Sequence, residues 1–186
     1  RLKMAAFLLT TSRLTNGPKV RQFEKKWAEW LGVDYSLYVS SGSTANSLLI
    51  ASIKELCGLK DGDKVLVPAT TWMTNVAPVI QNGLHLIGLS SDVERIEDIF
   101  PNALILEDTC ESHGVQGPDL NKRGTLSAGS TFSFYFGHHM TTIEGGMVCT
   151  NNPDLYDLMR LKRSHGMARE SDLNREKYVA ENPDID

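Results

Sequence analysis

Apolar residues recur along this chain in two alternating patterns, short continuous runs and longer stretches at helical spacing. The helical stretches begin after Gly17-Pro18, after Gly42, after Trp72 and at Asn152, with a short one over residues 93–100. The apolar runs predict strands at residues 36–39, 64–67, 84–89, 103–106, 131–135 and 147–150. Because helices alternate with short apolar strands, the pattern predicts an α/β fold, a mostly parallel sheet with helices on its faces.

The clearest local signals bound the first long helix. Pro18 suits a first helical position, and Val20, Phe23 and Trp27 then recur at helical spacing. Gly32 follows where a left-handed cap would end the helix. This helix is predicted to be structural.

The two ends of the chain are less patterned. The first 13 residues, RLKMAAFLLTTSR, contain an apolar run far below the roughly 20 residues that a membrane span needs. We expect this leading segment to pack on the core. Residues 168–186 are polar and weakly patterned, so they are either a loop or the start of an element that the chain does not complete. One large domain is expected over residues 1–167.

Composition and charge exclude several functions. The net charge of −4 and the lack of a dense Lys/Arg run provide no footprint for nucleic acid or anionic lipid. The three cysteines, Cys57, Cys110 and Cys149, are far apart and show no CxxC spacing, which argues against a disulfide framework or a zinc site. We therefore expect a cytoplasmic enzyme that acts on a small molecule.

The segment SSGSTAN follows a predicted strand and opens a predicted helix, an order that points backbone amides at an anion. Gly42 would allow close approach of the backbone, and Ser43 could cap the helix and donate its hydroxyl to a phosphate. For this segment alone, a capped helix without a ligand is the favoured interpretation.

The segment ILEDTCESHG places Asp108 at the end of a predicted buried strand, where open parallel sheets carry ligand-binding residues. A carboxylate there could pair with the ring nitrogen of a pyridine cofactor and keep that ring protonated. Alternatively, Asp108 caps the next helix, with Glu107 and Glu111 as solvated neighbours. The two interpretations are evenly matched on this segment alone.

Two further segments carry candidate chemistry. In VPATTWMTN, Trp72 could stack on a flat cofactor ring, although a lone tryptophan is more often a core residue. In FSFYFGHHMTTIEGG, Ser133 near the end of a strand could bind a phosphate, and His138 and His139 lie in a turn. Because adjacent strand residues face opposite ways and no third ligand accompanies the pair, acid–base chemistry is favoured over metal binding, and a plain hydrogen-bonded loop is the alternative.

Taken together and in this order, the four segments resemble the DegT/DnrJ/EryC1/StrS family of pyridoxal-phosphate enzymes that act on nucleotide-linked sugars. The resemblance runs from residues 14–18 to residues 163–166. It implies the large domain of the aspartate aminotransferase fold, fold type I, with three α/β/α layers. It also implies a homodimer and, as possible amino donor, glutamate.

The resemblance assigns a role to each candidate residue. Gly42, Ser43 and Ser133 correspond to residues around the cofactor phosphate. Trp72 falls against the cofactor ring, and Asp108 falls on its pyridine nitrogen. Glu111 stands where aminotransferases of the family commonly have a glutamine near the phenolic oxygen of the ring.

His138 occupies the position at which the aminotransferases of the family carry a lysine that forms a Schiff base with the cofactor. No lysine lies between Lys122 and Lys162, so a shift in alignment does not restore one. The His138-His139 turn resembles the subgroup that removes the C3 hydroxyl of nucleotide-linked 4-keto-6-deoxyhexoses with pyridoxamine phosphate and a histidine base. An imidazole suits proton transfer near neutral pH. His139 is expected to touch the substrate or support His138.

Two departures from the family pattern leave alternatives open. Only LSSDVERIEDIFPN separates Gly88 from Ala103, where the family has further strands and helices, so the domain looks shortened between about residues 89 and 102. The chain also ends at Asp186, before the family's small C-terminal domain. The alternatives to a C3 dehydratase are a sugar aminotransferase whose lysine has been lost and a shortened, non-catalytic protein that serves in binding or assembly.

Overall fold

The structure, a computed structural model, describes residues 2–89 and 99–181 of the chain. Its helices are α1 (Leu2–Thr10), α2 (Pro18–Leu31), α3 (Gly42–Leu56), α4 (Met73–Gln81), α6 (Pro153–Arg163), the 3-10 turn η1 (Ala168–Glu170) and α7 (Arg175–Glu181). Its strands are β1 (Tyr35–Val39), β2 (Lys64–Pro68), β3 (His85–Leu89), β4 (Leu106–Asp108), β5 (Gly129–Ser133) and β6 (Gly146–Thr150). None of the described helices is long and apolar enough to span a membrane.

The strands form two sheets. Four of them lie in the order β1-β6-β5-β4, and β2 and β3 form a separate pair. The predicted parallel arrangement holds for β2 with β3 and for β4 with β5, whereas β6 runs antiparallel to both of its neighbours. The reason is the connection before β6, a loop without a crossover helix, which can return the chain only as an antiparallel neighbour.

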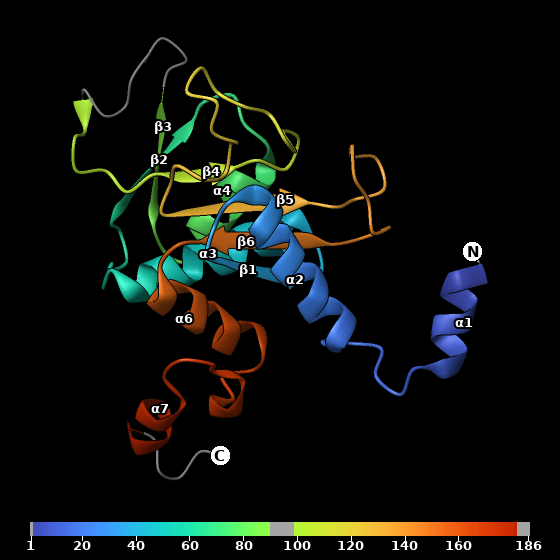
Figure 1. Ribbon diagram of the computed structural model, residues 1–186. Coiled ribbons are helices and arrows are strands. Elements are labelled where there is room, and N and C mark those ends of the chain that lie inside the picture. Colours follow the sequence, from blue (N-terminus) through green and yellow to red (C-terminus); the bar gives the residue numbers. More distant parts are fainter. Residues whose placement is uncertain (1, 90–98, 182–186) are drawn as a thin grey trace.

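The four-stranded sheet lies between helices on both faces, as Figure 1 shows. On one face, side chains of β1 and β6 pack with α3 and α6 in a cluster of Leu37, Val39, Ala45, Leu49, Ile53, Val148, Leu155 and Met159. On the other face, α2 contributes to a cluster of Trp27, Leu31, Phe132, Phe134, Met147 and Cys149. Successive residues of β6 alternate between the two clusters, which confirms the predicted three-layer α/β/α arrangement.

Helix boundaries follow the local signals, with one correction. Helix α2 has Pro18 in its first turn and ends at Gly32, whose φ of 96° is the left-handed cap conformation. For α3, the predicted cap Ser43 is wrong: Ser41 is the capping residue, and it forms a reciprocal capping box with Thr44. Ser43 therefore lies inside the first turn, where its hydroxyl is not used for capping.

Other boundaries differ from the sequence prediction. The strand expected at residues 103–106 forms at Leu106–Asp108, and the one expected at residues 131–135 forms at Gly129–Ser133, because the two pair in register with each other. Most of the short helix expected over residues 93–100 lies outside the described residues. Helix α1 has no buried residue and lies apart from the body of the molecule, so the expectation that the leading segment packs on the core is wrong (Figure 1).

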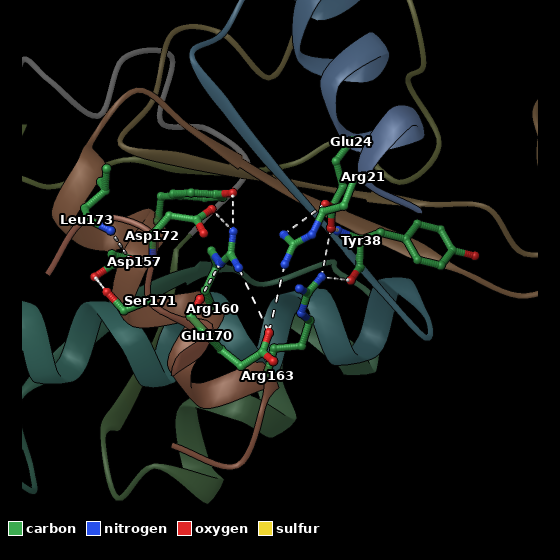
Figure 2. Close-up of polar contacts among 11 residues, drawn as sticks. Arg21, Glu24, Tyr38, Asp157, Arg160, Arg163, Glu170, Ser171, Asp172 and Leu173 are labelled. Carbon is green, nitrogen blue, oxygen red and sulfur yellow. Dashed lines mark hydrogen bonds and ion pairs between the residues drawn. The ribbon is translucent and has the colours of Figure 1, made fainter. Parts of the chain in front are cut away.

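A polar cluster fastens the segment after α6 to the domain (Figure 2). Asp157 is fully buried and accepts hydrogen bonds from Ser171 Oγ at 2.6 Å and from the backbone N–H groups of Asp172 and Leu173. Arg160 donates to the Glu170 carbonyl and pairs with Asp172. The polar residues that follow residue 167 are therefore ordered against the domain. The domain boundary predicted at residue 167 stays a prediction.

The aromatic cluster beneath α2 encloses a histidine. The ring of His113 lies 5.7 to 5.9 Å from the rings of Trp27, Phe132 and Phe134. Both of its nitrogens are shielded from solvent. Burial lowers the pKa of His113 below its usual value, and the charges of protonated His138 and His139 lower it further, against an opposing contribution from the Ser133 backbone.

This lowered pKa predicts a loss of stability in mild acid. The unfolded chain binds a proton at His113 near pH 6.5, but the folded chain does so only at a lower pH. The free energy of unfolding therefore falls as the pH drops below about 6.5, until the folded-state pKa is reached. Urea unfolding between pH 7.5 and pH 5 should show a smaller pH dependence for His113→Phe than for the parent chain. His85→Phe, at an exposed position of β3, is the control, and equal pH dependence in all three proteins would contradict the prediction.

Candidate functional site

The end of β5 and the turn after β4 meet the first residue of α3. A methyl group added at Gly42 would lie 2.7 Å from Ser133 Cβ and 2.9 Å from Cys110 Sγ. Only glycine allows this approach. The predicted phosphate residues Gly42 and Ser133, distant in sequence, are thus brought together, and Ser43 stands beside Gly42 in the first turn of α3.

The first turn of α3 has the properties of an anion site. The helix is 15 residues long, and the backbone N–H groups of Gly42 and Ser43 stand at its N-terminus, the positive end of the helix dipole. Burial, followed by the nearby Asp108 charge, raises the pKa of the Cys110 thiol well above its usual value. Cys110 therefore stays neutral and adds no negative charge beside Gly42.

A buried amide, Asn46, connects the parts of the site. Asn46 Nδ2 donates to Asp108 Oδ2 at 3.0 Å and to Asn75 Oδ1 at 2.9 Å, and Asn46 Oδ1 accepts from Thr131 Oγ1 at 2.6 Å. It thereby links α3 with α4, β4 and β5. Sequence reasoning missed Asn46; the available signal was a polar residue within the apolar stripe of a helix.

Asp108 is held by two donors yet open to solvent. Besides the amide of Asn46, it accepts a hydrogen bond from the Cys110 backbone N–H at 3.1 Å. The sequence prediction that it closes a buried strand is wrong, because β4 is the edge strand of its sheet and only partly buried, with Asp108 exposed. The alternative that Asp108 caps a following helix is wrong, because residues 109–128 form no helix and the next element is β5. Asp108 instead stabilises a local turn through the Cys110 N–H and presents a fixed carboxylate.

The loop between β5 and β6 carries the two histidines. His138 is largely buried, with a side chain 17% exposed, and its Nδ1 lies 3.9 Å from Oε1 of the exposed Glu111. The ring centres of His138 and His139 each lie 6.4 Å from that of His113. The premise that adjacent residues face opposite ways is wrong here, because the pair lies in a loop and not in a strand.

Sequence reasoning could not find that His113 lies beside His138 and His139, because no spacing rule links it to His138. Even with this third histidine, no group of His, Cys, Asp and Glu side chains within residues 2–89 and 99–181 is arranged to hold a metal ion. The cluster has an outer carboxylate, Glu111, beside His138.

Trp72 precedes α4, and its side chain is 75% exposed, so it is not the core residue that a lone tryptophan usually is. Asn75, three residues later, is bound to Asn46, which ties the start of α4 to the rest of the site. The structure therefore gathers Gly42, Ser43, Ser133 and Asp108 around α3 and pairs Glu111 with His138. It leaves the Trp72 ring free on the surface.

Comparison with known proteins identifies similar chains. The chain is 35% identical to a GDP-4-keto-6-deoxy-D-mannose 3-dehydratase of Yersinia pseudotuberculosis, an alignment covering 87% of this chain and 50% of the relative. It is 29% identical to a GDP-perosamine synthase of Caulobacter vibrioides, over 81% of this chain and 49% of that one. A crystal structure of GDP-4-keto-6-deoxymannose-3-dehydratase with a trapped PLP-glutamate geminal diamine superposes with a TM-score of 0.81 at 29% identity, covering 90% of this chain and 53% of the other.

The chain spans about half the length of the curated relatives it matches. The alignment with the Yersinia protein runs over 201 positions, more than the 186 residues of this chain, so the relative contains a stretch without a counterpart here. The model of the DegT/DnrJ/EryC1/StrS aminotransferase family matches in two segments, residues 1–85 and 83–183. The junction falls at β3, just before the stretch that the sequence indicates is shortened. With the matched segments covering nearly all of its length, the chain belongs to the DegT/DnrJ/EryC1/StrS aminotransferase family.

Proposed function

We propose that this protein binds pyridoxal 5'-phosphate, or the amine form pyridoxamine 5'-phosphate, and catalyses C3 dehydration of a nucleotide-linked 4-keto-6-deoxyhexose. One observation carries the proposal. His138, paired with Glu111 at 3.9 Å, takes the place in the β5–β6 loop that the family resemblance gives to a cofactor-binding lysine. A histidine there favours proton transfer over covalent capture of the cofactor.

The residues at the start of α3 fit a phosphate group. A ligand phosphate there would accept hydrogen bonds from the Gly42 and Ser43 N–H groups and from the hydroxyls of Ser43 and Ser133. The helix dipole favours its negative charge, and neutral Cys110 does not oppose it. The absence of a Cβ at Gly42 leaves the space that close approach requires.

The ring of the cofactor fits the remaining residues. Asp108, oriented by Asn46 and the Cys110 N–H, would bind the pyridine nitrogen and keep it protonated. Trp72 offers an exposed flat face for stacking, and Glu111 would lie near the phenolic oxygen. When bound, the protonated ring supplies an electron sink for carbanion chemistry.

His138 supplies the proton transfer. Its Nδ1 lies 3.9 Å from Oε1 of the exposed Glu111 carboxylate, which is placed to orient the ring. Nε2 is the proposed proton-transfer atom: it would accept a proton in the reaction and deliver it to the departing C3 hydroxyl, which would leave as water. His139, on the same loop and equally near His113, is proposed to contact the substrate or support His138.

The names of the relatives support a proposal for the substrate class. The Yersinia relative is named for a GDP-linked 4-keto-6-deoxy sugar, and the superposed crystal structure contains glutamate bonded to the cofactor. We propose a nucleotide-linked sugar of this kind as substrate, glutamate as amino donor, and a place in the synthesis of deoxysugars for surface polysaccharide. Since the three cysteines are free, we also propose a reducing, cytoplasmic setting.

We further propose a homodimer whose interface lies beside the site. Three apolar side chains on or next to the site segments are between 67% and 75% exposed, namely Trp72, Met73 and Phe136. Apolar surface of this kind is typical of a face that another subunit covers.

Cofactor binding is the first test of the enzyme proposal. Incubation with pyridoxal phosphate should give the absorbance band of the bound aldehyde, and subsequent glutamate should convert it to the band of the amine. Borohydride should attach no cofactor to the chain, because no lysine occupies position 138. Failure to retain cofactor at millimolar concentration would favour the non-catalytic alternative.

Replacing His138 by lysine tests its position. In His138→Lys, borohydride should fix about one cofactor per chain, whereas the matched variant His139→Lys should fix none. Dehydration of a GDP-4-keto-6-deoxyhexose should be lost in His138→Lys. It is followed as formation of the GDP-linked 4-keto sugar that lacks the C3 hydroxyl. A gain of transamination with glutamate, together with no dehydration by the parent chain, would favour the aminotransferase alternative.

The proposed interface is tested by sedimentation equilibrium. The parent chain should sediment as a dimer, and Phe136→Glu should weaken association at least about tenfold, because a buried charge replaces an apolar contact. The control Val179→Glu, on the partly exposed face of α7, should leave the dissociation constant unchanged. A monomeric parent chain would contradict the dimer proposal.

A further inference from the structure

A strained residue lies in the loop that carries His138 and His139. Ile143 has a φ of 77°, in the left-handed region, and its side chain is 71% exposed. A β-branched residue rarely adopts this conformation, because its side chain clashes with the backbone. Since an exposed side chain gains little from packing, other contacts must hold the turn in place.

Within the loop, Ile143 N–H donates to Thr141 Oγ1 at 2.9 Å and Thr142 Oγ1 donates to the Glu144 carbonyl at 2.8 Å. From outside the loop, the contacts come from one side chain, Tyr38 of β1. Its hydroxyl donates to the Glu144 carbonyl at 2.9 Å and lies 2.8 Å from Thr142 Oγ1. The two groups that it holds stand immediately before and after Ile143. A Cβ at Gly145 would overlap with the Tyr38 hydroxyl, so glycine at position 145 is needed for this approach.

The hydrogen bonds on either side of this turn reach the base of the loop. Thr142 N–H donates to the Phe134 carbonyl at 3.0 Å, and Phe134 N–H donates to the Gly145 carbonyl at 2.8 Å. The Tyr38 and Phe134 rings are nearly parallel, with centres 6.3 Å apart. Tyr38 therefore contacts both parts of the loop, Phe134 through its ring and the turn at Ile143 through its hydroxyl.

Tyr38 is itself fixed by a buried ion pair, as Figure 2 shows. Its N–H donates to Glu24 Oε1 at 2.9 Å, and its carbonyl accepts from Arg163 Nη1 at 3.0 Å. Glu24 and Arg163 are joined at 2.8 Å with side chains only 6% and 9% exposed. The hydroxyl of Tyr38 is therefore presented from a rigid backbone.

We propose that Tyr38 is a positioning residue for His138: it holds the strained turn at Ile143 and so fixes the loop from which His138 acts. The inference rests on the proton-transfer role proposed for His138. Without the hydroxyl, the turn relaxes, the closing bond from Thr142 to Phe134 opens, and His138 loses its fixed place beside Glu111.

The test uses the full chain without cofactor, so its result does not depend on whether the proposed reaction occurs. In Tyr38→Phe, amide hydrogen exchange at Thr142 and His138 should rise roughly tenfold, because two hydrogen-bonding contacts to the turn are lost. The matched control is Tyr35→Phe, on the same strand and also half-buried, whose ring stacks on Tyr156. It should change these rates less than about twofold.

Relief of the strain provides a rescue. Asparagine tolerates the left-handed conformation far better than isoleucine and is less flexible than glycine. Tyr38→Phe combined with Ile143→Asn should therefore recover at least half of the lost protection on a logarithmic scale. Failure of this rescue would overturn the assignment of strain to Ile143.

A second readout separates positioning from general destabilisation. In the nuclear magnetic resonance spectrum, the imidazole signal of His138 in Tyr38→Phe should move toward that of exposed His85. In Tyr35→Phe it should stay in place. A His138 signal that does not move, or exchange rates that rise equally in both variants, would overturn the proposal.

Discussion

The buried pair of Glu24 and Arg163 fixes the frame on which the rest of the site is built. Strand β1 is an edge of its sheet, and the backbone groups of Tyr38 that face away from β6 would otherwise lack partners. The ion pair satisfies both of them, in place of a further strand. Removing one member of such a pair leaves an uncompensated charge and typically costs about 3–5 kcal/mol. The position of β1 therefore depends on contacts from α2 and α6.

The site is connected to this fixed strand in two ways, along the chain and through strand pairing. The chain passes from β1 into the Ser41–Gly42 turn and α3, while β6, paired with β1, begins at Gly146 directly against that turn. Asn46 then joins α3 to β4, β5 and α4. In the proposed function the arrangement separates two tasks: helix and strand ends would hold an anion and a ring, while a loop would carry the acid–base residue. A change from lysine to histidine can alter the chemistry without disturbing the framework.

The sequence predicts features that are encoded locally. Pro18 and Gly32 define α2 because their backbone preferences act within one helix turn, and the six strands follow from short apolar runs. The strand expected at residues 103–106 begins three residues later and ends two residues later, because its position is set by pairing with β5 and not by its own composition. Asn46 and His113 were missed because their importance comes from partners far away in sequence. The exposure of α1 was also missed, because an apolar run does not reveal whether a partner surface exists.

The division of the strands into two sheets has a consequence for how the molecule opens. Strands β2 and β3 and the helix between them are contiguous in sequence, pack around Val67, Val79 and Leu84, and share no strand pairing with the larger sheet. The larger sheet, by contrast, is closed by segments from opposite ends of the chain; Asp34 and Asn151, 117 positions apart, are joined by a hydrogen bond. Units of the first kind can unfold and refold on their own, whereas units of the second kind open only with the whole molecule. We therefore expect β2, α4 and β3 to open locally before the larger sheet does, with α3 as the helix that joins the two parts.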